Sequence, residues 1–265
     1  MKRFFILVTS LMVLLCGFNA YAQTSYKMGP GDEIRMTVYG QDDLTTETQI
    51  SADGTIEVPL LGPMQVAGRS SSEAARIIAD YYVRAKLLQN AHVNMVITAY
   101  RSQSVSILGK VNNPGKIILD GPLSLTEALA SAGGVAETGS ERLILVRANP
   151  DGKQERHEYD LQKLLNHEAA NTPIVWLKDG DTLYVPVAGR FYVSGEVRAP
   201  GMYLLDRGLT VRQALGVAGG LTPRASGRSL QLFRKLPDGS VKELKAQPND
   251  PVLDGDVLVV NESLF

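Results

Sequence analysis

The first part of the chain alternates between strand-like and helix-like hydrophobic patterns. Residues 33–39 carry apolar side chains at every second position, which predicts a half-buried strand. Strand-like runs on both sides of Asp53-Gly54 predict a hairpin, because Asp-Gly favours a tight turn. From Ser70 the apolar spacing changes to three and four, and Ser70 forms a capping-box pattern with Glu73, so we expect a helix there. The expected apolar face of this helix is Ala74, Ile77, Ile78, Tyr81, Ala85 and Leu88.

The rest of the chain contains one pattern twice. The stretch GKVNNPGKIILDGPLSLTEALASAGG begins at Gly109, and GEVRAPGMYLLDRGLTVRQALGVAGG begins at Gly195, 86 residues later. Each copy predicts a strand, a Pro-Gly turn, a second strand, a short helix that ends at a Gly pair, and two strands around a Pro-Asp-Gly turn. The duplication therefore predicts two tandem modules, each with one helix on a mixed sheet.

Turn residues occupy matching positions in the two copies. We expect Gly115 and Gly201 to hold positive φ in the turns that follow Pro114 and Pro200. The Gly pairs should end their helices in the left-handed conformation. Together with turn and strand-start residues of the first domain, the predicted structural positions are Asp32, Asp53, Gly54, Gly109, Pro114, Gly115, Gly133, Gly134, Gly195, Pro200, Gly201, Gly219 and Gly220.

Residues 1–22 have the pattern of a secretory signal peptide. A basic start precedes an apolar run that includes Cys16, and an A-x-A site ends at Ala22. The alternative, an uncleaved anchor, is less favoured because the run is short for a span of roughly 20 residues. We expect cleavage between Ala22 and Gln23. Cys16 would then be removed, which excludes thiol chemistry in the mature chain.

Composition narrows the possible functions. Without the two basic residues of the signal peptide, 25 Lys and Arg face 28 Asp and Glu, and no basic cluster is present. Nucleic acid is therefore not an expected partner. The three histidines have no metal-ligand spacing, and neither a nucleophile elbow nor a complete phosphate loop occurs. We predict no catalytic residue, no cofactor and no metal site.

Three acidic residues next to glycines precede predicted strands: Asp32, Asp179 and Asp254. They could bind calcium or sugar hydroxyl groups, or they could form Asp-Gly turns that lead into the strands. We favour the turn interpretation. A glycosidase that uses paired carboxylates is not ruled out by spacing alone, but nothing marks one of these acids as a proton donor.

The order of these motifs resembles a known family. The segments YKMGPGDEIRMTVYG and ISADGTIEVPLLGPMQVAGRSSSEA, followed by two copies of G-x-V-x-x-P-G … AGG, are similar to the Wza-like outer-membrane polysaccharide export (OPX) proteins. The resemblance implies an α+β fold, with a polysaccharide export domain over residues 23–101. Two tandem β-grasp (SLBB) modules would follow, over residues 102–188 and 189–265.

The resemblance also implies a function without catalysis. Members of the family form periplasmic rings at the outer membrane, octameric in the best-known case, and pass polysaccharide through the ring. They meet an inner-membrane polysaccharide copolymerase. Because only five residues follow the last predicted strand at Val260, we expect a separate outer-membrane β-barrel as a further partner. The alternative is a periplasmic glycan-binding or scaffold module that forms no conduit. The polysaccharide-contacting residues are not identified by the resemblance.

Overall fold

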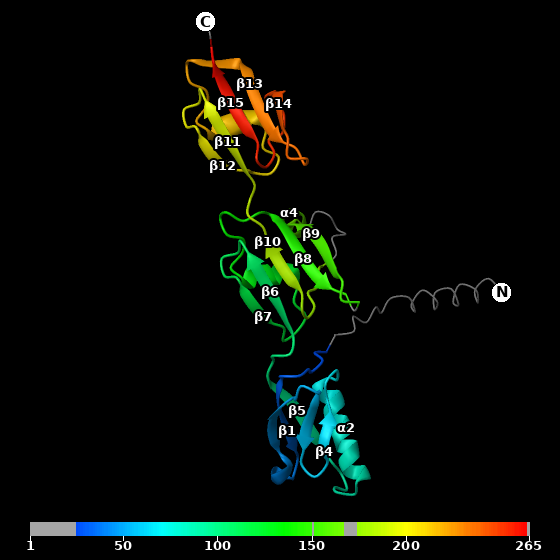
Figure 1. Ribbon diagram of the computed structural model, residues 1–265. Helices are drawn as coiled ribbons and strands as arrows, with labels where there is room; N and C mark the ends of the chain where they lie inside the picture. The colour runs from blue at the N-terminus through cyan, green and yellow to red at the C-terminus, as the bar shows by residue number, and fades with distance from the viewer. Residues whose placement is uncertain (1–24, 150, 167–173, 264–265) are drawn as a thin grey trace, which may run out of the picture. The chain divides into compact units, whose positions relative to one another are not determined.

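The structure is a computed structural model that describes residues 25–149, 151–166 and 174–263 (Figure 1). The predicted cleavage site at Ala22 and Gln23 lies outside these residues. Within the described ranges, no helix is both long and apolar enough to span a membrane.

Contacts divide the chain into two compact units. The first unit ends at Ser102 and also includes residues 120–122, and the second unit contains the two repeated modules. The first unit holds a sheet of order β2-β1-β5, a β3-β4 hairpin and one long helix. The bounds are β1 (Glu33–Val38), a 3-10 helix η1 (Asp42–Leu44), β2 (Thr46–Gln49), β3 (Thr55–Val58), β4 (Gly62–Gln65), α2 (Ser71–Arg84) and β5 (Val93–Ala99).

Strand β1 confirms the alternation seen in the sequence. Its residues Ile34, Met36 and Val38 are buried in one core with residues of α2 and β5. Burial of alternate apolar side chains removes one face of the strand from water and provides the main driving force for this packing.

Helix α2 begins as predicted and buries Ala74 and Ile78 of the predicted face, but Tyr81 and Ala85 of that face are exposed. The Glu73 N–H donates to Ser70 Oγ at 3.2 Å, and the Ser70 N–H donates to Glu73 Oε2 at 2.8 Å, which completes the capping box. The prediction that Tyr81 belongs to the buried face is wrong, since Tyr81 is 50% exposed. Tyr82 is buried instead, because its hydroxyl can donate to the carbonyl oxygen of Pro59 at 2.8 Å.

The predicted hairpin around Asp53-Gly54 is also wrong. A turn is present, with Gly54 at φ 84° and a Thr55 N–H bond to Asp53 Oδ1 of 3.1 Å. However, β2 pairs with β1 and β3 pairs with β4, so the strands on either side of the turn diverge. The carbonyl of Gly54 instead accepts the N–H groups of Val66 and Ala67, which ties the turn to the end of β4.

The two repeated modules have the same sheet topology. The strand order is β7-β6-β10-β8-β9 in the first module and β12-β11-β15-β13-β14 in the second. The first module contains β6 (Ser104–Gly109), β7 (Gly115–Ile118), α3 (Leu125–Ser131), β8 (Arg142–Ala148), β9 (Gln154–Asp160), α4 (Leu161–Leu165) and β10 (Thr182–Val185). The second contains β11 (Arg190–Gly195), β12 (Gly201–Leu204), α5 (Val211–Val217), β13 (Ala225–Lys235), β14 (Val241–Lys245) and β15 (Val257–Glu262).

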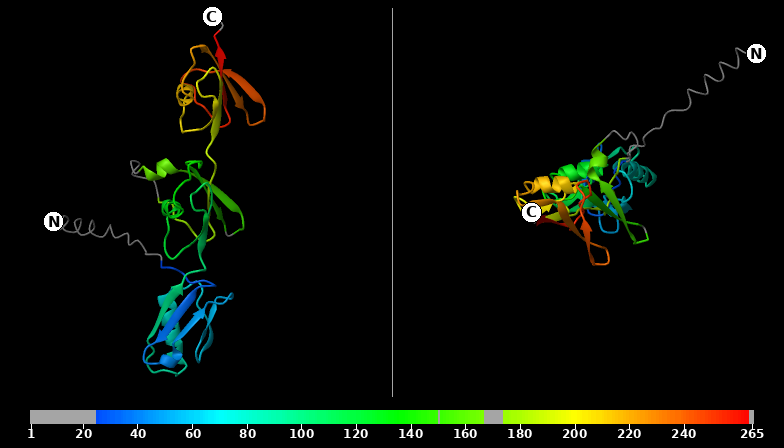
Figure 2. Two further views of the ribbon diagram at one scale, coloured as in Figure 1. Left: turned by 90° about the vertical axis from the view of Figure 1, so that its left-hand side faces the viewer. Right: turned by 90° about the horizontal axis from the view of Figure 1, so that it is seen from above.

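Each module is a mixed sheet with a helix on one face. The pairs β6/β10 and β11/β15 are parallel, and the other strand pairs in these sheets are antiparallel. Figure 2 shows α3 and α5 to one side of their sheets. Apolar side chains of both helices contribute to the two module cores. Among the described residues, the opposite face of each sheet carries no helix.

The turn glycines differ from the prediction at one pair of positions. Gly115 and Gly201 do not have positive φ, because they already begin the extended strands β7 and β12. Positive φ occurs earlier, at Gly109 (89°) and Gly195 (86°). A Cβ atom on either residue would lie 2.1 Å from a carbonyl oxygen of the neighbouring parallel strand, so both turns require glycine.

The helix ends agree with the prediction. Gly133, Gly134, Gly219 and Gly220 all have φ between 74° and 81°. The N–H of Gly134 donates to the carbonyl of Leu129 at 2.9 Å, which satisfies one of the last helical carbonyls.

Candidate functional site

A buried ion pair lies at the same place in both modules. Asp181 and Asp256 start the central strands and are almost fully buried. Arg147 donates to both oxygens of Asp181 at 2.8 and 2.6 Å, and Arg234 donates to both oxygens of Asp256 at 2.9 and 2.7 Å. The hydrogen bonds to Asp181 raise the pKa of Arg147 above its usual value. Each acid forms an ion pair with an arginine of its own module, and both acids therefore act as structural groups.

Asp32 is also buried, but its carboxylate accepts hydrogen bonds from backbone N–H groups and hydroxyls instead of an arginine. Its carboxylate accepts the N–H groups of Gly29, Arg101 and Ser102 at 2.8–2.9 Å, and the hydroxyls of Ser102 and Tyr26, each at 2.9 Å from Oδ2. Burial would raise the pKa of Asp32, but the hydrogen bonds from the backbone outweigh burial and lower it. Burial, with the nearby Asp32 carboxylate, raises the pKa of Tyr26 to about 12.

The other two acids support the turn interpretation. Asp179 Oδ1 accepts the N–H of Ser104, and Asp254 Oδ1 accepts the N–H of Arg190, both at 2.8 Å. Each is followed by a glycine with positive φ. Across the described ranges, no group of three or more His, Cys, Asp or Glu side chains has the arrangement of a metal site.

The open face of the second module's sheet carries a row of apolar side chains. Met202, Tyr192, Val257 and Phe233 are register neighbours on β12, β11, β15 and β13. We call these four residues the apolar stripe. Tyr192 is 44% exposed and Met202 is 49% exposed, although both belong to regular strands. The row ends at Glu243 on β14.

Polar and charged groups flank the apolar stripe on this face. On one side, Arg190 pairs in register with Leu204, and its Nη1 lies 3.7 Å from Met202 Sδ. The Nε atom of Arg190 is buried and has no hydrogen-bond partner among the described residues. On the other side, the neighbouring row contains Ser194, Val259, Gln231 and Lys245.

The first module differs at the equivalent positions. The row that matches the apolar stripe contains Lys116, Ser106, Thr182, Val146 and Arg156, and is mostly polar. The next row along the same strands is the apolar one, with Leu108, Tyr184 and Ile144, and ends at Glu158. The duplicated modules thus share a fold but present different open faces.

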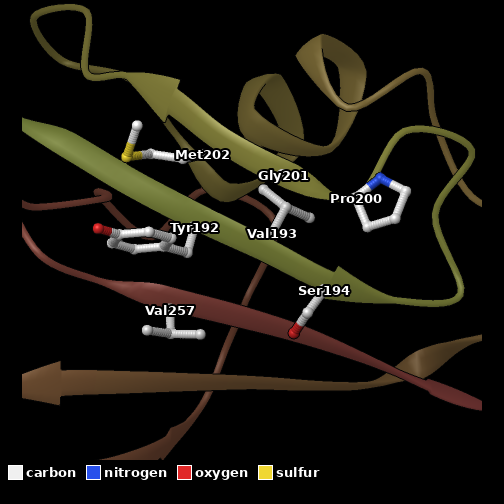
Figure 3. Close-up of a pocket in the computed structure, with 7 residues that line it drawn as sticks. All are labelled: Tyr192, Val193, Ser194, Pro200, Gly201, Met202 and Val257. Atoms are coloured by element: carbon white, nitrogen blue, oxygen red, sulfur yellow. The ribbon is translucent and has the colours of Figure 1, made fainter.

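A shallow pocket of about 610 Å³ lies on the open face of the second module. Figure 3 shows Met202, Tyr192 and Val257 on three adjacent strands, with Pro200 at the turn before β12. The lining residues are Tyr192, Val193, Ser194, Pro200, Gly201, Met202 and Val257. Pro200 and Gly201 are therefore the only two residues of the predicted structural set that line this pocket. We take the pocket and the apolar stripe as the candidate functional site.

Sequence reasoning missed Tyr192, Met202 and Phe233. A signal for them was present, because the strands that contain them are apolar on both faces, as in Phe191-Tyr192-Val193 and Leu232-Phe233. A sheet covered by a helix on one face alone should alternate. The uninterrupted apolar run therefore indicates a contact on the second face.

Comparisons with known proteins agree with this architecture. A model of the polysaccharide biosynthesis/export protein family matches residues 20–98. Models of the SLBB domain match residues 103–185 and residues 190–242.

The curated relatives are longer than this chain. The EPS I polysaccharide export outer membrane protein EpsA of Ralstonia solanacearum is 29% identical, and the match covers 86% of this chain and 67% of the relative. The polysialic acid transport protein KpsD of Escherichia coli is 28% identical, and the match covers 94% of this chain and 43% of the relative. The chain therefore spans about two thirds of one relative and less than half of the other.

The fold and the matches define an α+β protein with an export domain followed by two SLBB domains. The matched relatives carry the names of a polysaccharide export outer membrane protein and a polysialic acid transport protein. The chain belongs to the Wza-like outer-membrane polysaccharide export family.

Proposed function

We propose that this protein is a periplasmic, ring-forming component of a machine that secretes capsular polysaccharide or exopolysaccharide. It passes the polymer to and across the outer membrane and does not make or break bonds. The observation that carries the proposal is the order of domains, with an export domain before two SLBB domains. The names of the relatives, a polysaccharide export outer membrane protein and a polysialic acid transport protein, support it.

The proposal includes partners, location and domain limits. The protein forms a homo-oligomeric ring at the periplasmic side of the outer membrane, and the family resemblance suggests an octamer. It contacts an inner-membrane polysaccharide copolymerase and a separate outer-membrane β-barrel. The export domain extends over residues 23–101, and the SLBB modules extend over residues 102–188 and 189–265.

Gene deletion and particle imaging test this proposal. Deletion should stop the appearance of polysaccharide outside the cell, and expression of the full chain should restore it. Electron micrographs of the purified complex should show rings. Unchanged export after deletion would contradict the proposal.

A second candidate is a periplasmic glycan-binding or scaffold protein that forms no conduit. The apolar stripe favours this candidate, because an exposed apolar row that contains an aromatic ring, Tyr192, is suited to holding a ligand. A chain that remains monomeric at high concentration in the presence of its partners, while export still depends on it, would support this second function.

A further inference from the structure

We propose that the apolar stripe of the second module binds an acidic polysaccharide. One pyranose ring of the polysaccharide stacks on Tyr192, and carboxylates of the polysaccharide face Arg190 and Lys245. This inference rests on the proposed function for the nature of the polymer. It adds the place where the polymer is held and the charge that the site prefers.

The width of the apolar stripe suits a sugar ring. Equivalent side chains on one face of a strand are two residues apart, so neighbouring rows are separated by about 7 Å. The stripe is one row wide and has polar or mixed rows on both sides. A specific protein interface needs a broader apolar centre within roughly 800 Å² per partner. A single six-membered ring needs only the width of the stripe.

The side chains supply the matching chemistry. One face of a pyranose ring presents C–H bonds, which are attracted to the negative face of an aromatic ring. Tyr192 offers such a ring, and Met202 and Val257 extend the apolar surface beside it (Figure 3). Ser194 lies in the adjacent row, where its hydroxyl can hydrogen-bond with hydroxyl groups at the edge of the sugar ring.

Charge favours an acidic polymer. Arg190 forms no ion pair in the described part of the chain, and its buried Nε lacks an acceptor there. A guanidinium prefers a carboxylate that can accept two hydrogen bonds. Lys245 lies on the opposite margin of the same face. Residues 189–265 contain ten Lys and Arg against eight Asp and Glu, a net charge of +2.

The first module lacks this combination. Its apolar row contains Tyr184, which is 41% exposed, and ends at Glu158, just as the apolar stripe ends at Glu243. The two modules differ in the arginines near this row. Arg142 and Arg156 already pair with Glu158, at 3.6 and 3.4 Å. Residues 102–188 contain eight Lys and Arg against eleven Asp and Glu, a net charge of −3. An acidic polymer should therefore prefer the second module, and Tyr184 provides a matched control.

The experiment is a titration of the mature full chain with oligomers of sialic acid, followed by NMR of the Met and Val methyl groups. Maltohexaose serves as the neutral probe. We expect the methyl signals of Met202 and Val257 to shift with sialic acid oligomers and to shift much less with maltohexaose. Raising the salt concentration should weaken the binding, because the attraction is partly between charges.

Three variants test the roles of the side chains. Tyr192→Leu keeps an apolar side chain but removes the ring, and should weaken binding by about 3–10-fold. Arg190→Gln should weaken binding of the acidic oligomer about tenfold and reduce its salt dependence. Tyr184→Leu should leave the affinity unchanged. Unperturbed methyl signals of the module cores will show that each variant is folded.

Several outcomes would overturn the inference. These are an absence of shifts with sialic acid oligomers, equal binding of maltohexaose, and equal effects of Tyr192→Leu and Tyr184→Leu. Self-association that Tyr192→Leu abolishes, without glycan shifts, would identify the stripe as a protein interface. If the titration fails but gene deletion stops export, only this inference is wrong. If deletion leaves export intact, the proposed function is wrong whatever the titration shows.

Discussion

Asp32, Asp181 and Asp256 are carboxylates that the fold removes from water. A buried carboxylate is stable only where cations or several N–H and O–H groups face its oxygens. The modules use an arginine for this purpose, whereas the first domain uses backbone N–H groups and two hydroxyls. In each case the acid links segments that are distant in sequence, which makes these residues sensitive positions for stability.

Breaking the ion pair of the second module should be strongly destabilising. Asp256→Ala leaves Arg234 largely buried without its partner, so the free energy of unfolding should fall by about 3–5 kcal/mol. Urea unfolding of the full chain measures this loss. The double variant Asp256→Leu with Arg234→Met removes both charges and should recover much of the stability. Equal losses in the single and double variants would contradict the ion-pair explanation.

Asp32 should make the stability of the first domain depend on pH. Its pKa is lower in the folded state than the ordinary aspartate value of 3.8, so the unfolded state binds the proton more readily. The contribution of Asp32 is complete above the unfolded pKa and is lost as pH falls through the folded pKa.

Asp32→Asn tests this linkage. At pH 7 the variant should be less stable by about 2–3 kcal/mol, because the carboxylate and its charged hydrogen bonds are gone. The difference from the wild type should shrink once the pH falls below 3.8. Hydrogen exchange of the β1 and β5 amides, measured over a pH series, gives the stability difference at pH 7 and its change with pH. A difference that does not change with pH would show that the carboxylate charge is not responsible.

At the scale of elements, the modules depend on a close approach between parallel strands. The carbonyl of Val185 faces Gly109, and the carbonyl of Val260 faces Gly195, so the end of each central strand meets a glycine. The Pro-Gly turns, by contrast, place Gly115 and Gly201 in extended backbone with room for a side chain.

We therefore expect the second module to tolerate a side chain at Gly201 but not at Gly195. Gly195→Ala combines positive φ with a Cβ position 2.1 Å from Val260 O, and should lower stability by more than about 2 kcal/mol. Gly201→Ala should change stability by less than about 0.5 kcal/mol, because it meets neither restriction. Thermal unfolding of the two variants compares them directly. Similar losses at both positions would contradict the assigned turn geometry.

At the scale of the whole molecule, duplication supplied two copies of one fold whose open faces then diverged. The core positions and helix caps remain equivalent, as the boxes at Ser124 and Thr210 illustrate. The rows on the open faces changed from mostly polar around Ser106 to apolar around Tyr192. The two modules therefore share one fold but present different surfaces on their open faces.

Cleavage of the predicted signal peptide would set the first residue of the mature chain. We expect the mature protein to begin at Gln23, because the A-x-A site ends at Ala22. Intact mass measurement of the protein purified from cells gives its first residue. A diacylated protein that begins at Cys16 would contradict this expectation and would identify a lipoprotein.

The sequence by itself determined the features that depend on near neighbours. The alternation in β1, the capping box at Ser70, and the Gly pairs after α3 and α5 could all be read in advance. Each of these features is decided by atoms within one turn of helix or a few strand residues. The duplication was equally visible, because matching turns and helices recur at a constant spacing.

Tertiary structure alone decided which distant residues meet. The pairing of β2 with β1 rather than β3, and the bond between Arg147 and Asp181, depend on strand order and register. The apolar stripe has the same origin, since Tyr192 and Phe233 share a row because β15 pairs with both of their strands. Register is set by the packing of the whole sheet against its helix, which local sequence patterns do not encode.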